Sequence, residues 1–164
     1  MSFELKANQA GSKADQYGLL LEQCKALIEG ERHVIANIAN TASLLYHSLQ
    51  NINWAGFYLS EENQLILGPF HGKPACIRIP LGKGVCGTAA STKETQRVED
   101  VHAFPGHIAC DSASNSEIVI PLLHNERVYG VLDIDSPDFS RFDEEDQAFL
   151  EELVRVLVKG CNWE

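Results

Sequence analysis

The hydrophobic pattern changes its period twice along this chain, and that change limits the folds it can adopt. The first and last parts carry apolar residues at helical spacing, whereas the middle carries short apolar runs separated by polar turns. The predicted helices cover residues 15–30, 31–49 and 142–159, and the predicted hairpins pair residues 53–60 with 64–68 and 117–123 with 127–135. Helices at both ends of a run of hairpins predict an α+β domain with an antiparallel sheet, one face of which is covered by the terminal helices.

Shorter elements lie between the two hairpins. We expect strands at 75–80 and 95–98, a helix at 84–92 and an ordered loop at 100–115, because long loops without structure of their own are uncommon unless they are functional. Asp143, with Asp146 three residues later, is the predicted N-cap of the last helix. The segment 76–86 and the loop 100–115 should roof a pocket on the free face of the sheet. The 164 residues should form a single domain with a core of about residues 17–159.

Composition excludes several classes of function. The hydrophobic content of 45% and charged content of 22% are typical of a soluble globular protein. The formal net charge of −10 disfavours nucleic acids and anionic membranes as partners, and there is no apolar segment of membrane-spanning length. The opening residues MSFELKANQAGSKADQ lack the apolar run of a signal peptide, and the cysteine count of 5 is odd. These features favour the cytoplasm, where disulfides are more often catalytic than structural.

Aromatic and acidic residues alternate along the predicted strands. Residues two apart share a face, so Trp54 and Tyr58 should flank Gly56, and Asp133 should lie beside Asp135. Glu117 interrupts another run that is otherwise apolar, and buried acids are costly unless they are paired. Such a site would suit a ligand with an apolar end and an ammonium end. The residues alone leave open that the rings fill the core and that the acids end a strand in solvent.

Three cysteines, Cys76, Cys86 and Cys110, lie in or beside glycine-bearing loops. Cys110 is the strongest candidate nucleophile, since His107 three residues earlier could provide the positive charge that favours a thiolate. Inert packing is the alternative for any one buried cysteine. Cys24 and Cys161 lie in or after helices and are interpreted as incidental.

A zinc site is the second chemistry that these residues allow. His102, His107 and Cys110, with Cys76 or Cys86, could supply nitrogen and sulfur ligands. No paired Cys-x-x-Cys motif is present, and the candidates are scattered over loops, so we expect no metal.

The segments GVCGTAA, QRVEDVH, GHIACD, SNSEIVIPL and GVLDIDS together resemble the free methionine-(R)-sulfoxide reductases, which are built on the GAF domain. The resemblance covers residues 17–159 and implies a six-stranded antiparallel sheet with helices on one face and a pocket on the other. It implies that Cys110 is the nucleophile, Cys76 the resolving cysteine and Cys86 a third cysteine that assists. It further implies that the substrate is held by Glu117, Asp133 and Asp135 and by the aromatic walls Trp54 and Tyr58.

The activity implied by this resemblance is reduction of free L-methionine-(R)-sulfoxide through a sulfenic acid on Cys110 and a disulfide with Cys76, which thioredoxin would reset. No cofactor is required. We further expect the backbone N–H groups of residues 114–116 to bind the substrate carboxylate. The alternative is a non-catalytic GAF module that binds a small molecule or senses oxidants. The sequence leaves open whether Cys76 or Cys86 forms the first disulfide, which carboxyl is the proton donor, and whether the chain forms a homodimer.

Overall fold

The computed structural model describes residues 3–6 and 11–164, which form a six-stranded antiparallel sheet with helices on both sides. The strand order is β3-β2-β1-β6-β5-β4. The elements are α1 (Lys13–Ile28), α2 (Val34–Ser48), β1 (Trp54–Glu61), β2 (Gln64–Gly72), β3 (Arg78–Pro80), α3 (Gly84–Thr92), β4 (Gln96–Val98), a 3-10 turn (Val101–Ala103), β5 (Ser116–His124), β6 (Arg127–Ser136) and α4 (Glu144–Gly160).

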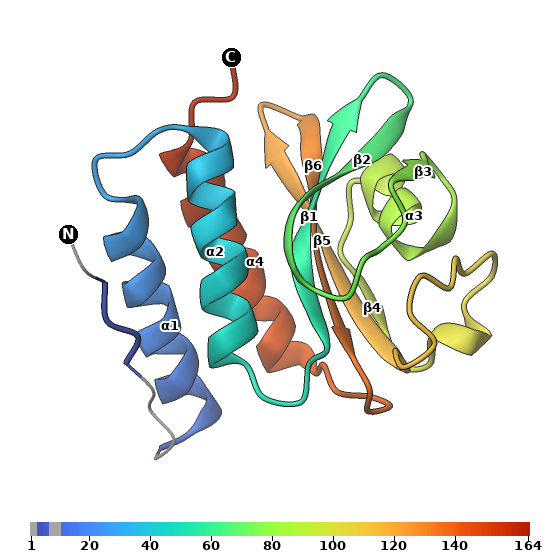
Figure 1. Ribbon diagram of the computed structural model, residues 1–164, viewed down its shortest axis with the longest axis horizontal. Coiled ribbons are helices and arrows are strands. Elements are labelled where there is room, and N and C mark those ends of the chain that lie inside the picture. The colour runs from blue at the N-terminus through green and yellow to red at the C-terminus, as the bar shows by residue number, and fades with distance from the viewer. Residues whose placement is uncertain (1–2, 7–10) are drawn as a thin grey trace.

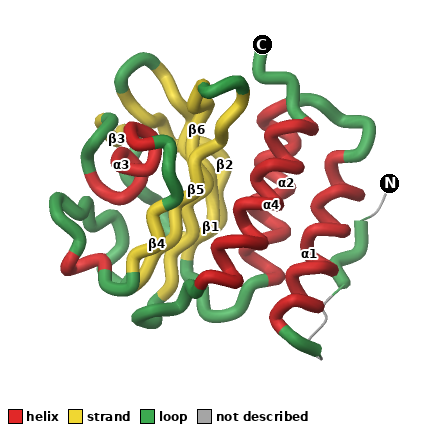
Figure 2. The backbone as a smooth tube through the Cα atoms, turned by 180° about the vertical axis from the view of Figure 1, so that it is seen from behind, coloured by secondary structure: helices red, strands yellow, loops and turns green. Residues whose placement is uncertain are grey.

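The layers separate the hydrophobic core from the site. Helices α2 and α4 pack directly on one face of the sheet, and α1 lies outside them (Figure 1). The opposite face carries α3 and the loops on either side of it (Figure 2). This arrangement confirms the predicted fold, with terminal helices on one face and a loop-roofed region on the other. Among the described residues, no helix is long and apolar enough to cross a membrane.

The helix-covered face is apolar because alternate residues of the central strands are large hydrophobics. Phe57 of β1, Ile118 of β5 and Leu132 and Ile134 of β6 are fully buried against the helices. One carboxylate lies within this layer. Asp146, in the first turn of α4, is buried and accepts hydrogen bonds from Tyr17 Oη at 2.6 Å and Lys13 Nζ at 2.6 Å, so it ties α1 to α4.

The register of the three central strands places the predicted site residues in adjacent rows. Asp135 of β6 lies opposite Trp54 of β1 on one side and Glu117 of β5 on the other. In the neighbouring row, Asp133 lies between Gly56 and Val119. The aromatic wall and the carboxylates therefore come together on the free face because of strand pairing between segments that are far apart in sequence.

The element boundaries agree with the expected ones within a few residues, with one clear exception. Helix 84–92 is confirmed at both ends, and Asp143 caps α4 through a capping box with Asp146. Strand β2 was predicted to end at Gly68, and this is wrong: it continues through Pro69 to Gly72. Strand β3 pairs only with residues 64–66 of β2, so the missing N–H of Pro69 lies where β3 requires no donor.

Candidate active site

A pocket opens on the free face of the sheet, beneath the roof formed by residues 73–86 and 107–114. Strands β1, β5 and β6 form its floor, and α3 closes one side. Seven of the eight residues singled out from the sequence line it, and the eighth, Cys76, is bonded to one of them. The lining comprises Trp54, Tyr58, Lys73, Pro74, Ala75, Ile79, Lys83, Gly84, Val85, Cys86, His107, Ile108, Cys110, Asp111, Ser114, Glu117, Asp133 and Asp135.

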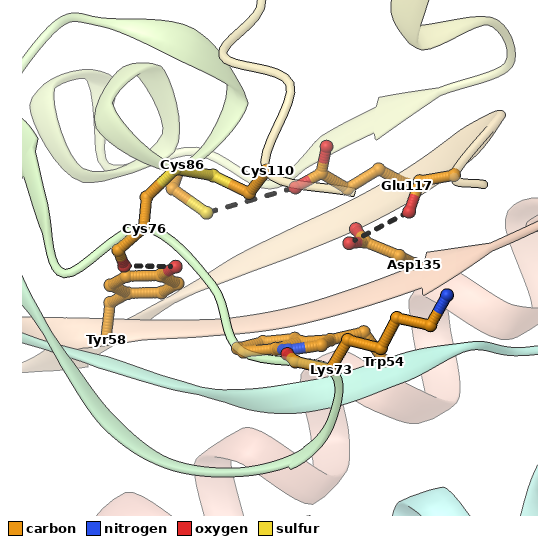
Figure 3. The surroundings of a disulfide bond; sticks show 9 residues. Trp54, Tyr58, Lys73, Cys76, Cys86, Cys110, Glu117 and Asp135 are labelled. Carbon is orange, nitrogen blue, oxygen red and sulfur yellow. Dashed lines mark hydrogen bonds between the residues drawn. A yellow bond between two sulfur atoms is a disulfide. The ribbon is translucent and has the colours of Figure 1, made fainter. Parts of the chain in front are cut away.

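Aromatic rings make up one wall. The rings of Trp54 and Tyr58 are stacked with centroids 5.9 Å apart, and Phe70 stacks on Trp54 at 5.1 Å. A Cβ at Gly56 would lie 2.3 Å from the Cβ of Phe70, so glycine is required for β2 to bring that ring close. The polar ends of the two wall residues hold the roof, because Trp54 Nε1 donates to Lys73 O at 3.1 Å and Tyr58 Oη donates to Cys76 O at 3.0 Å (Figure 3).

Three carboxyl groups form the acidic part of the pocket. Glu117 and Asp133 are 7% and 6% exposed, and among the described residues Asp133 Oδ1 and Asp135 Oδ1 are buried without a hydrogen-bond partner. Burial raises the pKa of all three groups, and the neighbouring negative charges raise those of Glu117 and Asp135 further. Hydrogen bonding from its neighbours, Glu117 first, offsets part of the rise in the pKa of Asp133. Burial therefore favours the protonated forms of the three groups, and a cation bound among them would favour the ionised forms instead.

The roof carries a disulfide bond between Cys76 and Cys110 (Figure 3). Their Cα atoms are 5.7 Å apart, and the bond joins the segment after β2 to the loop before β5. Cys86 in α3 is a free thiol, 4% exposed, and its Sγ donates to Glu117 Oε1 at 3.9 Å. Burial raises the pKa of this thiol, and the nearby carboxylates raise it further.

A hydrogen-bond network fixes the Cys110 loop to the sheet, and sequence reasoning missed it. Asn53 Nδ2 donates to Asp111 Oδ2 at 3.2 Å and to Ser114 Oγ at 3.1 Å. Ser114 Oγ in turn lies 3.4 Å from Asp135 Oδ2, to which it donates. Asn53 immediately precedes the wall residue Trp54, and its position one residue before the aromatic strand was the only available signal.

Two expectations about the loop are corrected. Of the three N–H groups expected to bind the substrate carboxylate, those of Ser114 and Asn115 already donate to Asp111 O at 3.2 Å and Ser136 O at 2.8 Å, so these two are not free to do so. His107 lines the pocket, but burial lowers its pKa, which favours the neutral imidazole over the positive charge expected beside Cys110. Positively charged side chains line the pocket at Lys73 and Lys83 instead, and neither was predicted from the sequence.

The zinc ligand set that was weighed from the sequence is not assembled. His102 is exposed with its Nδ1 2.9 Å from Asp100 Oδ1, and the sulfur atoms of Cys76 and Cys110 are bonded to each other. The two cysteines interpreted as incidental lie on the other side of the sheet. Cys24 and Cys161 are buried in the hydrophobic core on the helix-covered side of the sheet.

The chain is similar to known proteins over most of its length. Residues 25–158 match the family model of the GAF domain. A free methionine-R-sulfoxide reductase of Escherichia coli is 55% identical over 148 residues, which make up 90% of this chain and 90% of that protein. The structure of a free methionine-R-sulfoxide reductase from Neisseria meningitidis in complex with its substrate has a TM-score of 0.90 and 43% identity, covering 96% of this chain and 95% of that one. The enzyme of Staphylococcus aureus, also in complex with substrate, has a TM-score of 0.85 and 54% identity, covering 88% and 94% of the two chains. The chain therefore belongs to the free methionine-R-sulfoxide reductases, oxidoreductases built on the GAF domain.

Proposed function

We propose that this protein reduces free L-methionine-(R)-sulfoxide to methionine, with residues 17–159 as its single catalytic domain and Cys110 as the nucleophile. One observation carries the proposal: Cys110 is disulfide-bonded to Cys76 directly above a pocket that combines an aromatic wall with three buried carboxyl groups. A redox-active pair of thiols and a cation-binding pocket are the two parts that this reaction requires. The related enzymes from E. coli and N. meningitidis support it.

The pocket suits each part of the substrate. The S-methyl group would lie against Trp54 and Tyr58, and the α-ammonium would pair with Asp133 and Asp135, whose buried Oδ1 atoms need a partner. The carboxylate would lie toward the ammonium groups of Lys73 and Lys83. Methionine within a peptide chain has no α-ammonium, so its binding would leave buried acids unpaired, and the site would select the free amino acid.

The first step transfers the sulfoxide oxygen to the sulfur of Cys110. The Cys110 thiolate attacks the sulfoxide sulfur while Glu117 or Asp135, whose pKa burial raises, gives a proton to the oxygen. The attack joins the two sulfur atoms; the protonated oxygen then moves to the Cys110 sulfur as the sulfur–sulfur bond and the original S–O bond break, so methionine leaves and Cys110 becomes a sulfenic acid. The cysteine is oxidised by two electrons, and the sulfoxide is reduced by the same two.

The second step forms the disulfide, and a third regenerates the thiols. The Cys76 thiol attacks the Cys110 sulfur, water leaves, and the Cys76–Cys110 disulfide forms. A dithiol reductant, for which we propose thioredoxin, then exchanges with this disulfide. The half-buried position of Cys76 in the roof would leave its sulfur open to such an exchange.

The test is thioredoxin-coupled NADPH oxidation with three substrates: free L-methionine-(R)-sulfoxide, its (S) epimer and a peptide-bound sulfoxide. We expect turnover with the free (R) epimer alone. The absence of turnover with all three, in folded protein whose thiols have been reduced, would favour a ligand-binding or oxidant-sensing module instead.

The roles of the cysteines are tested separately. Cys110→Ser should abolish turnover, whereas Cys76→Ser should release about one methionine per enzyme and then stop, because its sulfenic acid has no resolving partner. Cys24→Ser is the control, since Cys24 lies outside the pocket. Multiple turnover by Cys76→Ser at the parent rate would exclude Cys76 as the main resolving cysteine and point to Cys86.

A further inference from the structure

Three ligand atoms of the pocket lie close enough together to hold a metal ion. The Cys86 thiol and one carboxylate oxygen each of Glu117 and Asp133 are all within 4.8 Å of one another, and all three residues are buried. The separation of Cys86 Sγ from Glu117 Oε1 is 3.9 Å. Ligand atoms at the usual distances from a tetrahedral zinc ion are about 3.6 Å apart, so a small inward shift completes the geometry.

The cluster also lacks a positive charge. Asp133 lines the pocket and is almost entirely buried, and its Oδ1 has no hydrogen-bond partner among the described residues. Burying a carboxylate without a partner costs free energy, and an ion that coordinates it would recover that cost. This unpartnered oxygen is an observation separate from the proximity of the three ligands, and it could be paired by the substrate ammonium or, in its absence, by a metal ion.

The donor set selects the kind of ion. A thiolate is a soft ligand that favours zinc and related transition metals, whereas magnesium and calcium prefer oxygen alone. Two carboxylates and one thiolate leave the fourth tetrahedral position for a water molecule or for His107, which lines the same pocket. Binding would release the thiol proton and the protons of the carboxyl groups.

We propose that Cys86, Glu117 and Asp133 form a zinc site that overlaps the substrate pocket and makes the enzyme reversibly sensitive to zinc. The ion would occupy Asp133, one of the two carboxylates proposed to pair with the substrate ammonium, so it competes with the substrate. The inhibitory consequence depends on the proposed function, but the binding does not. The ligand set excludes both cysteines of the disulfide, so the oxidised protein retains the site.

The test uses cobalt(II) as a spectroscopic probe of the oxidised protein, whose Cys76 and Cys110 sulfurs are unavailable. In the variant Cys24→Ala/Cys161→Ala, Cys86 is the one remaining free thiol of the five cysteines. We expect one equivalent of cobalt to give a thiolate-to-cobalt charge-transfer band, which zinc removes and magnesium leaves unchanged. The absence of that band would overturn the proposal.

Two further variants assign the ligands. Cys86→Ala, with the other four cysteines retained, should lose the band, and its persistence would place the metal on Cys24 or Cys161 instead. Glu117→Gln should weaken cobalt binding at least tenfold, while the exposed control Glu94→Gln should leave it unchanged. Because the oxidised protein does not turn over, these results stand whether or not methionine sulfoxide is the substrate. Inhibition is measured separately: zinc should raise the apparent KM for the sulfoxide in the reduced enzyme with little change in kcat.

Discussion

Removing one charge from the acidic cluster should stabilise the protein while it damages catalysis. Carboxylate oxygens of Glu117 and Asp133 lie within 4.8 Å of each other in a buried site. Two unit charges at that distance repel by about 3 kcal/mol at an effective dielectric constant of about 20. Retained protons already relieve part of this repulsion. We therefore expect Glu117→Gln, which keeps the shape and the acceptor for the Cys86 thiol, to raise the free energy of unfolding by about 1 to 3 kcal/mol.

The stability gained by Glu117→Gln should depend on pH, and the raised pKa of Glu117 gives the direction of that dependence. Burial raises the pKa of Glu117 in the folded state, so the folded protein binds protons more tightly than the unfolded chain does. The contribution of the cluster to stability is therefore greatest in acid and is lost as the pH rises through the raised pKa values. The advantage of Glu117→Gln should accordingly be largest near neutral pH and should shrink toward about pH 5.

Thermal unfolding of the oxidised protein measures this prediction. For a chain of this length the expected gain corresponds to an increase in Tm of about 2 to 10 °C. Glu94→Gln, at an exposed position, is the control and should change Tm little. A lower Tm for Glu117→Gln near neutral pH, or a gain that grows toward acid, would refute the reasoning about the buried charges. Turnover of free methionine sulfoxide by the same variant should fall at least tenfold, because one of the two proposed proton donors is lost.

Three further changes test the geometry of the pocket. Trp54→Ala should raise KM for the sulfoxide about tenfold or more with a smaller effect on kcat, in steady-state kinetics, since it removes the wall and not the nucleophile. Gly56→Ala should lower the free energy of unfolding, measured in denaturant, by about 1 to 3 kcal/mol, because the new Cβ would collide with Phe70. Gly18→Ala in helix α1 is the control: no atom lies within 4 Å of its new Cβ, so it should stabilise the protein by up to about 1 kcal/mol. Asn53→Ala should slow formation of the Cys76–Cys110 disulfide after a single turnover, measured by quenched thiol labelling, because it frees the loop that carries Cys110; an unchanged rate would show that the loop is held by other contacts.

The sequence predicted the order and type of the main elements because their periodicity is local. The helical stripe of α2 and the polar turns of both hairpins are visible within a dozen residues. The course of β2 beyond Gly68 was not predictable in this way. A proline can lie within a strand only where the neighbouring strand requires no N–H donor from it. For β2 that neighbour is β3, which begins ten residues after Gly68, so the local sequence does not show where the pairing ends.

Only part of the site could be predicted from the sequence, and the reason is related. Alternation along a strand places Asp133 beside Asp135, but only the pairing of β1, β6 and β5 brings Trp54 and Glu117 into the same row. The contacts of Asn53, the lowered pKa of His107 and the occupied N–H groups of Ser114 and Asn115 all depend on the path of the loop before β5. No periodic pattern encodes the path of such a loop.

The disulfide between Cys76 and Cys110 affects the stability of the protein as well as its proposed chemistry. The bond closes a loop of 34 residues, and a cross-link of that span restricts the unfolded chain by about 3 to 4 kcal/mol. In the proposed cycle, each turnover would join two segments of the roof, and each reduction would separate them. The reduced form, which would accept substrate, would then be the less stable one, so a shortage of reductant would leave the protein inactive but more resistant to unfolding and to proteolysis.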